Sequence, residues 1–361
     1  MLNSAAPEGP RLGCPPPCAG YTFVFDRILG KLKNCEFPKE SQDMSQLLDA
    51  SARGVYTISA TPFTDSGDID WPSVDSLIEF YLQCGIQGLT VLGMMGEAQK
   101  LSDQESAEFT RHFLRRVNDR VPVIVGVSNP GTTNLVKLSK IAMDAGACGV
   151  MVAPLTGLKT ESQIVTYFAD VVAALGEKIP VVYQDYPQST QADISAQGFL
   201  KIVDVHPSVV MFKHEDCPGL RKLTQIRKAC DGTARRYISI LVGNGGLYVP
   251  QELARGADGI MTGFAYPEML VSVCALFAAG RSGDAEDLFD LYLPLVRHEQ
   301  QPGFGLAVRK EILRRRGAIR SAAVRSPGPK LDAHDVSELD RLLSRLEARL
   351  REGVNGQRAV A

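Results

Sequence analysis

The sequence predicts an α/β fold, a single (β/α)8 TIM barrel with a C-terminal helical extension. From Gly54 onward, short apolar runs alternate with longer amphipathic stretches, which is typical of repeated βα units around a parallel sheet. Eight such runs are present, and eight is the number of strands that closes a barrel of this kind. No G-x-G-x-x-G sequence follows an early strand, so an open dinucleotide-binding sheet is the weaker alternative.

The predicted strands share a short apolar run that ends at small or polar residues. They are residues 55–63, 88–93, 121–128, 149–154, 179–184, 208–213, 237–243 and 258–263. Helix signals lie between them, for example Ser102 as an N-cap with Glu105 three positions later. Gly85, Gly146 and Gly256 each follow a helical pattern, which suits the residue after a helix C-terminus.

Three segments are predicted along the chain. Residues 1–45 are rich in Pro and Gly and are predicted to be a flexible extension, residues 50–283 the barrel, and residues 284–350 helices packing on it. Cys14 and Cys18 flank prolines in the extension, but a metal site there lacks two further ligands nearby.

Composition excludes several classes of protein. The 361 residues are 45% hydrophobic and 22% charged, with a net charge of −2, so no nucleic-acid or membrane-surface partner is indicated. No apolar run is long enough to span a membrane, and the first residues do not resemble a secretory signal. The eight cysteines lack the spacing of a disulfide framework, which predicts free thiols and a cytoplasmic location.

Lys213 ends the sixth apolar run, directly after Phe212. In a TIM barrel the reacting groups come from the C-terminal ends of the strands and the loops after them. Loss of water around an amine lowers its pKa, and a neutral amine can attack a carbonyl. We therefore predict that Lys213 is a nucleophile; the alternative is a lysine that only pairs with Glu215 or Asp216.

Tyr183 belongs to the end of the fifth run, so its phenol is predicted to lie near Lys213 across neighbouring strands. A phenol at that place would carry protons to and from the substrate. The alternative is a tyrosine whose ring packs at the rim of the barrel.

A glycine turn, Gly93-Met94-Met95-Gly96-Glu97, follows the second run. Backbone N–H groups in such a turn can hold a carboxylate, so Met94, Met95 and Gly96 are predicted to bind substrate, with Glu97 capping the turn from below. A purely structural βα turn is the alternative.

Four further residues at strand ends are predicted to contact substrate: Thr61, Glu215, Gly243 and Asn244. A metal is not expected, because the side chains of the adjacent His214, Glu215 and Asp216 diverge and cannot all bind one ion.

Over about residues 50–350 the chain resembles the dihydrodipicolinate synthase/N-acetylneuraminate lyase superfamily of class I aldolases. The matching residues are Ala60-Thr61-Pro62-Phe63, Gly67, Asp70, Gly93, Gly96-Glu97, Leu101-Ser102, Glu105, Gly126-Val127, Pro154, Tyr183, Pro187, Phe212-Lys213 and Gly259. The resemblance implies that Lys213 forms a Schiff base with a 2-oxo acid, that Tyr183 is the catalytic tyrosine, and that no cofactor or metal is needed. It also implies a homo-oligomer, a dimer or a tetramer.

Departures from the family pattern bear on the substrate. Met94 and Met95 stand where members of the family usually carry hydroxyl residues, and Leu155-Thr156 replaces the usual Tyr-Tyr. No arginine follows Pro187, where the synthases bind aspartate semialdehyde. These losses argue against true dihydrodipicolinate synthase activity.

Other residues resemble the 2-keto-3-deoxy-L-arabonate dehydratases. These are Gln184-Asp185, Glu215 two positions after Lys213, and His298-Glu299 before a Gly-rich turn. We therefore expect a dehydratase of a 2-keto-3-deoxy sugar acid. Two alternatives are a pyruvate-dependent aldolase or synthase-like condensing enzyme, and a non-catalytic barrel that binds a 2-oxo acid.

Overall fold

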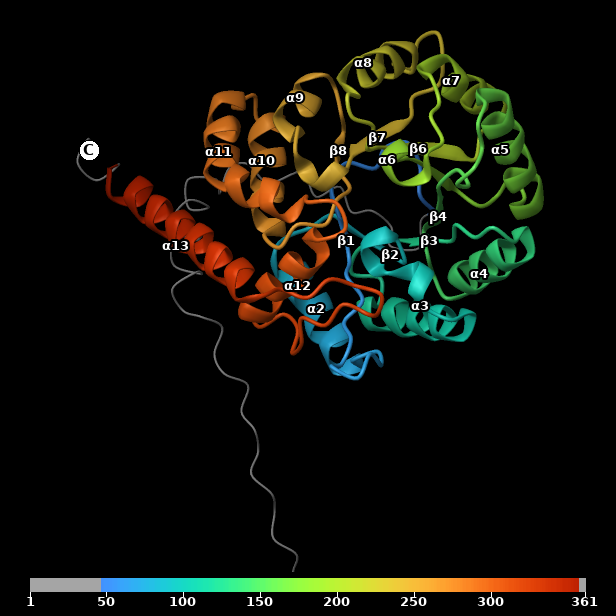
Figure 1. Ribbon diagram of the computed structural model, residues 1–361. Helices are drawn as coiled ribbons and strands as arrows, with labels where there is room; N and C mark the ends of the chain where they lie inside the picture. The colour runs from blue at the N-terminus through green and yellow to red at the C-terminus, as the bar shows by residue number, and fades with distance from the viewer. Residues whose placement is uncertain (1–46, 357–361) are drawn as a thin grey trace, which may run out of the picture.

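The computed structural model describes residues 47–356 (Figure 1). Eight parallel strands pair in chain order, and β8 pairs with β1, which confirms the predicted closed barrel. The strands are β1 Gly54–Ile58, β2 Gly88–Val91, β3 Val123–Gly126, β4 Gly149–Val152, β5 Val181–Asp185, β6 Val209–His214, β7 Ser239–Val242 and β8 Gly259–Ile260. The predicted extension at residues 1–45 lies outside the described part of the chain.

Helices surround the barrel and follow its strands. They are α2 Trp71–Gln83, α3 Asp103–Val117, α4 Thr132–Asp144, α5 Glu161–Leu175, α6 Pro187–Thr190, α7 Ala196–Val205, α8 Leu220–Ala229, α9 Val249–Ala254 and α10 Pro267–Ala278. Ser102 and Glu105 form the predicted capping box at the start of α3. Gly85, Gly146 and Gly256 have φ values of 76°, 96° and 91°, the left-handed backbone predicted for residues that follow a helix.

The strands are shorter than the apolar runs that predict them. β3 begins at Val123 rather than Val121 because Pro122 has no N–H to donate to the sheet. β1 ends at Ile58, and the apolar residues after it are buried in a loop instead, where Phe63 bridges to Ile69. An apolar run therefore predicts that its residues are buried, but not that all of them pair in the sheet.

Alternate residues of each strand enter two separate apolar cores. The interior of the barrel contains Tyr56, Ile58, Ile124, Met151, Val182, Met211, Leu241 and Met261. The larger outer core lies between the strands and the helices, and Tyr183 and Phe212 belong to it. Side chains that flank an interior residue on its strand consequently face the helices.

The segment before β1 closes the N-terminal end of the barrel. Leu48 and Ala52 pack with the interior core, and the N–H of Leu48 donates to the carbonyl of Cys148, just before β4. The Ser239 hydroxyl, at the start of β7, donates to the Ala52 carbonyl at 2.8 Å. The opposite end, where the strands finish, is left for the site.

Three helices extend the chain after the barrel: α11 Ser282–Glu299, α12 Gly305–Arg315 and α13 Ala333–Gly356. Figure 1 shows them gathered on one side of the barrel, with α13 projecting outward. No helix within residues 47–356 combines the length and apolar character needed to cross a membrane.

Candidate active site

Lys213 lies near the end of β6 and its side chain is buried. Met211, two residues earlier, faces the interior of the barrel, so Lys213 points to the same side. Its Nζ atom lies 2.9 Å from Oε2 of Glu215. The amine therefore stands inside the barrel, at the strand end where the sequence predicts it, with a carboxylate beside it.

Gln184 is the neighbour of Lys213 on β5, because the two residues are partners in the parallel register. The Nε2 atom of Gln184 donates to the same Glu215 oxygen at 2.7 Å. Lys213, Gln184 and Glu215 thus form one polar cluster, and Gln184 is a member that the sequence reasoning did not name as a site residue.

The prediction that the phenol of Tyr183 lies near Lys213 is wrong. Tyr183 precedes Gln184 on β5 and so faces the helices, where its ring packs on Phe168, Phe199 and Phe212. Its hydroxyl is buried without a hydrogen-bond partner among the described residues, and burial raises the pKa of the phenol well above its usual range. The alternative, a packed aromatic ring, describes its environment.

Glu215 is also held from β7. Oε1 of Glu215 accepts from the backbone N–H of Asn244 at 3.3 Å. A β-carbon at Gly243 would lie 2.4 Å from Cγ of Glu215, so only glycine lets the two strands bring these residues together. The side-chain oxygen of Asn244 accepts from Gln300, at the end of α11. Three predicted substrate contacts, Glu215, Gly243 and Asn244, therefore lie together.

The predicted glycine turn is a short 3-10 helix, η1 Met94–Gly96, directly after β2. Oγ1 of Thr61 donates to the Gly96 carbonyl at 2.6 Å, which places these two predicted residues in contact. Met95 packs against the interior core of the barrel. The N–H groups of Gly96 and Glu97 donate within the turn, to Gly93 and Met94.

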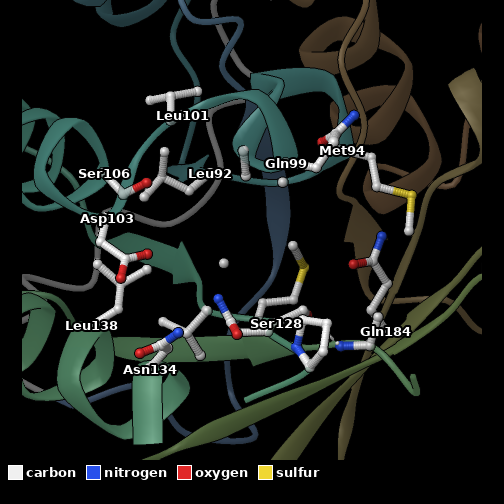
Figure 2. Close-up of a pocket in the computed structure, with 18 of the residues that line it drawn as sticks. Leu92, Met94, Gln99, Leu101, Asp103, Ser106, Ser128, Asn134, Leu138 and Gln184 are labelled. Atoms are coloured by element: carbon white, nitrogen blue, oxygen red, sulfur yellow. Dashed lines mark hydrogen bonds between the residues drawn. The ribbon is translucent and has the colours of Figure 1, made fainter. Parts of the chain in front are cut away.

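A cavity of about 660 Å³ opens at the ends of β2 to β5. Met94, Ser128, Ala153 and Gln184 are among its lining residues, one from each strand end. Figure 2 shows Met94 and Gln184 on one side of the cavity, with Asp103 and Leu138 on the other. The glycine turn and the Lys213 cluster consequently meet at this cavity through Met94 and Gln184.

Glu97 supports the turn from behind. Its backbone is left-handed, with φ 55°, and its carboxylate lies 2.6 Å from Nζ of Lys310 on α12 and 2.9 Å from Nζ of Lys100. Lys310 is fully buried, and burial lowers its pKa to about 8 although Glu97 opposes the shift. The sequence predicts Glu97 as a cap but gives no sign of Lys310, because the partner lies 213 residues away.

The outer face of β6 carries a second set of buried ionisable groups. Nδ1 of His214 lies 3.8 Å from Asp185, and Nε2 lies 4.0 Å from Glu252 on α9. Burial raises the pKa of Glu252 to about 8, and Glu215 adds to the shift. His214 faces outward and Glu215 inward, so they diverge as expected. Across residues 47–356, no three His, Cys, Asp or Glu side chains are grouped to hold a metal ion.

Comparisons with known proteins show the family to which the chain is related. Residues 51–346 match the model of the dihydrodipicolinate synthetase family. The chain is 31% identical to an L-2-keto-3-deoxyarabonate dehydratase of Azospirillum brasilense over 300 residues, 82% of this chain and 94% of the relative. It is 30% identical to a 4-hydroxy-tetrahydrodipicolinate synthase of Sorangium cellulosum, over 85% of this chain and 99% of that one.

A solved structure is similar throughout the barrel. The crystal structure of a dihydrodipicolinate synthase from Rhodopseudomonas palustris superposes with a TM-score of 0.81 and 45% identity, covering 83% of this chain and 99% of that one. Relatives named as dehydratases and as synthases thus share the fold and most of the length.

Proposed function

The chain belongs to the dihydrodipicolinate synthetase family of lyases, and from this premise we propose that Lys213 forms an imine with a 2-oxo acid. The observation that carries the proposal is the burial of Lys213 inside the barrel, 2.9 Å from Glu215. A carboxylate at this distance orients the amine and can accept the proton that the nitrogen releases once it has added to a carbonyl. We further propose that the reaction is the dehydration of a 2-keto-3-deoxy sugar acid.

Imine formation begins the reaction. The amine of Lys213 adds to C2 of the substrate, and the C2 oxygen leaves as water after gaining protons. The protonated imine then withdraws electrons from C3. Glu215 takes a proton from C3. The electron pair of that bond forms the C2–C3 double bond, and the π pair of the imine moves to nitrogen, giving an enamine.

Elimination follows from the enamine. The electron pair returns from nitrogen, the bond from C4 to its hydroxyl breaks, and Glu215 donates its proton so that the hydroxyl leaves as water. One proton then moves from C5 to C3 and the hydroxyl proton of C5 moves to C4, which turns C5 into an aldehyde. Hydrolysis of the imine releases this semialdehyde and restores Lys213. Glu215 thus performs both proton transfers, from C3 and to the leaving hydroxyl. Tyr183 does not take part, because its side chain lies in the outer core.

The substrate carboxylate is assigned to the glycine turn. Because the N–H groups of Gly96 and Glu97 are engaged inside η1, those of Met94 and Met95 are the donors we propose for it. Backbone donors do not depend on the side chain, so the two methionines leave this carboxylate site intact.

The dehydratase reaction is favoured over condensation for one reason in the chain. The stretch Pro187-Gln188-Ser189-Thr190 forms α6 and contains no arginine to bind a second carboxylate from that loop. A condensing enzyme remains the second candidate, because several relatives are named 4-hydroxy-tetrahydrodipicolinate synthase.

Reduction with borohydride in the presence of pyruvate tests the imine. We expect a covalent pyruvate adduct on the Lys213 peptide, detected by mass spectrometry, and none in Lys213→Ala. The matched control is Lys222→Ala, which removes another lysine that pairs with carboxylates, outside the barrel interior. An adduct on a different lysine contradicts the proposal.

Product analysis separates the candidate reactions. With a five-carbon 2-keto-3-deoxy acid, a dehydratase yields a semialdehyde that retains all five carbons, whereas an aldolase releases pyruvate and a two-carbon aldehyde. A protein that forms the imine but turns over neither way would be the non-catalytic binding barrel.

A further inference from the structure

Arg309 lies on α12, and its guanidinium reaches the rim of the barrel where the strands end. It is almost completely buried, at 2% exposed, and its Nε atom donates to Glu299 at 2.9 Å. Glu299 is itself buried, and its second oxygen accepts from the N–H of Ala265 at 3.4 Å. The pair is therefore fixed from three sides: α11, α12 and the loop after β8.

Gly263 shows which side of the barrel the guanidinium occupies. It comes two residues after Met261, whose side chain faces the interior, so a side chain at 263 would face the interior as well. A β-carbon there would lie 2.7 Å from Nη1 of Arg309 and 3.0 Å from the carbonyl of Ile58. Arg309 thus fills the interior space that Gly263 leaves open, at the same end as Lys213.

Nη1 of Arg309 has no hydrogen-bond partner within residues 47–356, although it is buried. A buried donor without a partner destabilises the protein, and more so when it is charged. Such a donor at the reacting end of a barrel is suited to an acceptor that arrives with the substrate.

Tyr186 connects Arg309 electrostatically with the Lys213 cluster. It follows β5 directly, and burial raises the pKa of its phenol, Glu215 raises it further, and Arg309 lowers it. Glu215 and Arg309 therefore act on the same phenol and have opposite effects on its pKa.

We propose that Nη1 of Arg309 binds a hydroxyl oxygen at the distal end of the substrate and so selects for a hydroxylated tail. This inference rests on the proposed function for the 2-oxo acid end of the ligand. Glu299 already pairs with Nε of Arg309 and offsets the charge of the guanidinium. Nη1 beside this paired carboxylate therefore fits a neutral oxygen better than a second carboxylate.

Three five-carbon acids that differ only at C5 test this proposal: 2-oxopentanoate, 5-hydroxy-2-oxopentanoate and 2-oxoglutarate. Their affinity is measured by the shift of the thermal midpoint, which needs neither imine nor turnover. We expect the hydroxylated acid to bind about tenfold more tightly than 2-oxopentanoate, the effect of one hydrogen bond from a charged donor. In Arg309→Gln the two acids should bind equally within about twofold.

Two controls accompany the variant. Arg314→Gln removes an exposed arginine of the same helix that pairs with Glu311, and it should keep the tenfold preference. If Arg309→Gln does not fold, the double variant Glu299→Gln/Arg309→Gln removes both charges, so no buried charge is left without a partner. Loss of the preference in either folded variant supports the proposal.

Several results overturn it. These are an unchanged preference without Arg309, a wild type that does not distinguish the two acids, and an Arg309-dependent preference for 2-oxoglutarate. Borohydride trapping on the same samples reports the proposed function separately. A protein that prefers the hydroxylated acid but forms no adduct would contradict the imine while leaving the role of Arg309 standing.

Discussion

Glu215 is the residue on which the proposed chemistry depends most, after the lysine itself. It accepts hydrogen bonds from Gln184 and Asn244 and lies 2.9 Å from Nζ of Lys213, so its position is fixed from β5, β6 and β7. We expect Glu215→Gln to lower kcat for dehydration by about 10²- to 10⁴-fold, the usual contribution of a general acid or base. Steady-state kinetics measures the loss, and trapping of pyruvate should survive on a longer time scale. Wild-type kcat in the variant would rule out this role.

Tyr183 provides the opposite prediction. Because its hydroxyl faces the helices and has no partner in the described part of the chain, Tyr183→Phe should leave kcat within about twofold. The variant should be as stable as the wild type or more so by up to about 1 kcal/mol, because an unsatisfied buried hydroxyl is removed. Steady-state kinetics measures kcat and thermal denaturation measures the stability. A hundredfold loss of kcat would mean that Tyr183 is a catalytic residue after all.

At the scale of elements, strand β6 separates two sets of charges on its two faces. Lys213 and Glu215 face inward, whereas His214 faces Asp185 and Glu252 on the outer side. The pKa of Glu252 is raised from 4.5 to about 8, chiefly by burial, so the folded protein binds a proton there that the unfolded chain has released. Stability is therefore lost as pH rises from about 4.5 to 8.

Glu252→Gln should remove this loss, because the amide cannot ionise. We expect the variant to gain on the wild type as the pH increases, by up to a few kcal/mol near pH 8. Thermal midpoints of both proteins at pH 5.5 and pH 8.5 measure the difference. Parallel curves would mean that Glu252 is not the group responsible.

The alternation of side chains between the two faces of a strand explains what could be predicted from the sequence. The number and order of strands followed from apolar runs, and Lys213 followed from its place at a strand end. The run before Gln184 is Val181-Val182-Tyr183, apolar on both faces because both faces of the strand are buried. Apolar and polar residues do not alternate in such a run. The sequence therefore did not show whether Tyr183 or Gln184 faces the interior.

At the scale of the whole molecule, the C-terminal extension contacts the candidate site. Lys310 and Arg325 lie over the ring of Phe63, 4.5 and 4.4 Å from its centroid. Both also donate to the Glu97 carboxylate, Lys310 from Nζ and Arg325 from its backbone N–H. Contacts of more than 200 residues in sequence separation cannot be read from spacing. This is why the contacts of Lys310 and Arg325 with Glu97 were not predicted.

Lys310→Met tests this coupling. Removal of one partner of a buried ion pair costs about 3–5 kcal/mol, because Glu97 is left buried with less compensation. Lys100→Met is the matched control, since Lys100 pairs with the same carboxylate but is partly exposed, and it should cost less than half as much. Denaturation of the two variants measures the free energy of unfolding; equal losses would contradict a special role for the link to α12.

The closed base of the barrel has a practical consequence for experiments on a surface. The chain enters the described fold at residue 47, where Leu48 and Ala52 cover the N-terminal end, opposite to Lys213. If the protein is anchored to a sensor chip through a label joined at this point, the end of the barrel that carries Lys213 faces away from the chip. The attachment would then lie away from Lys213, so affinities from immobilised protein should equal those measured free in solution.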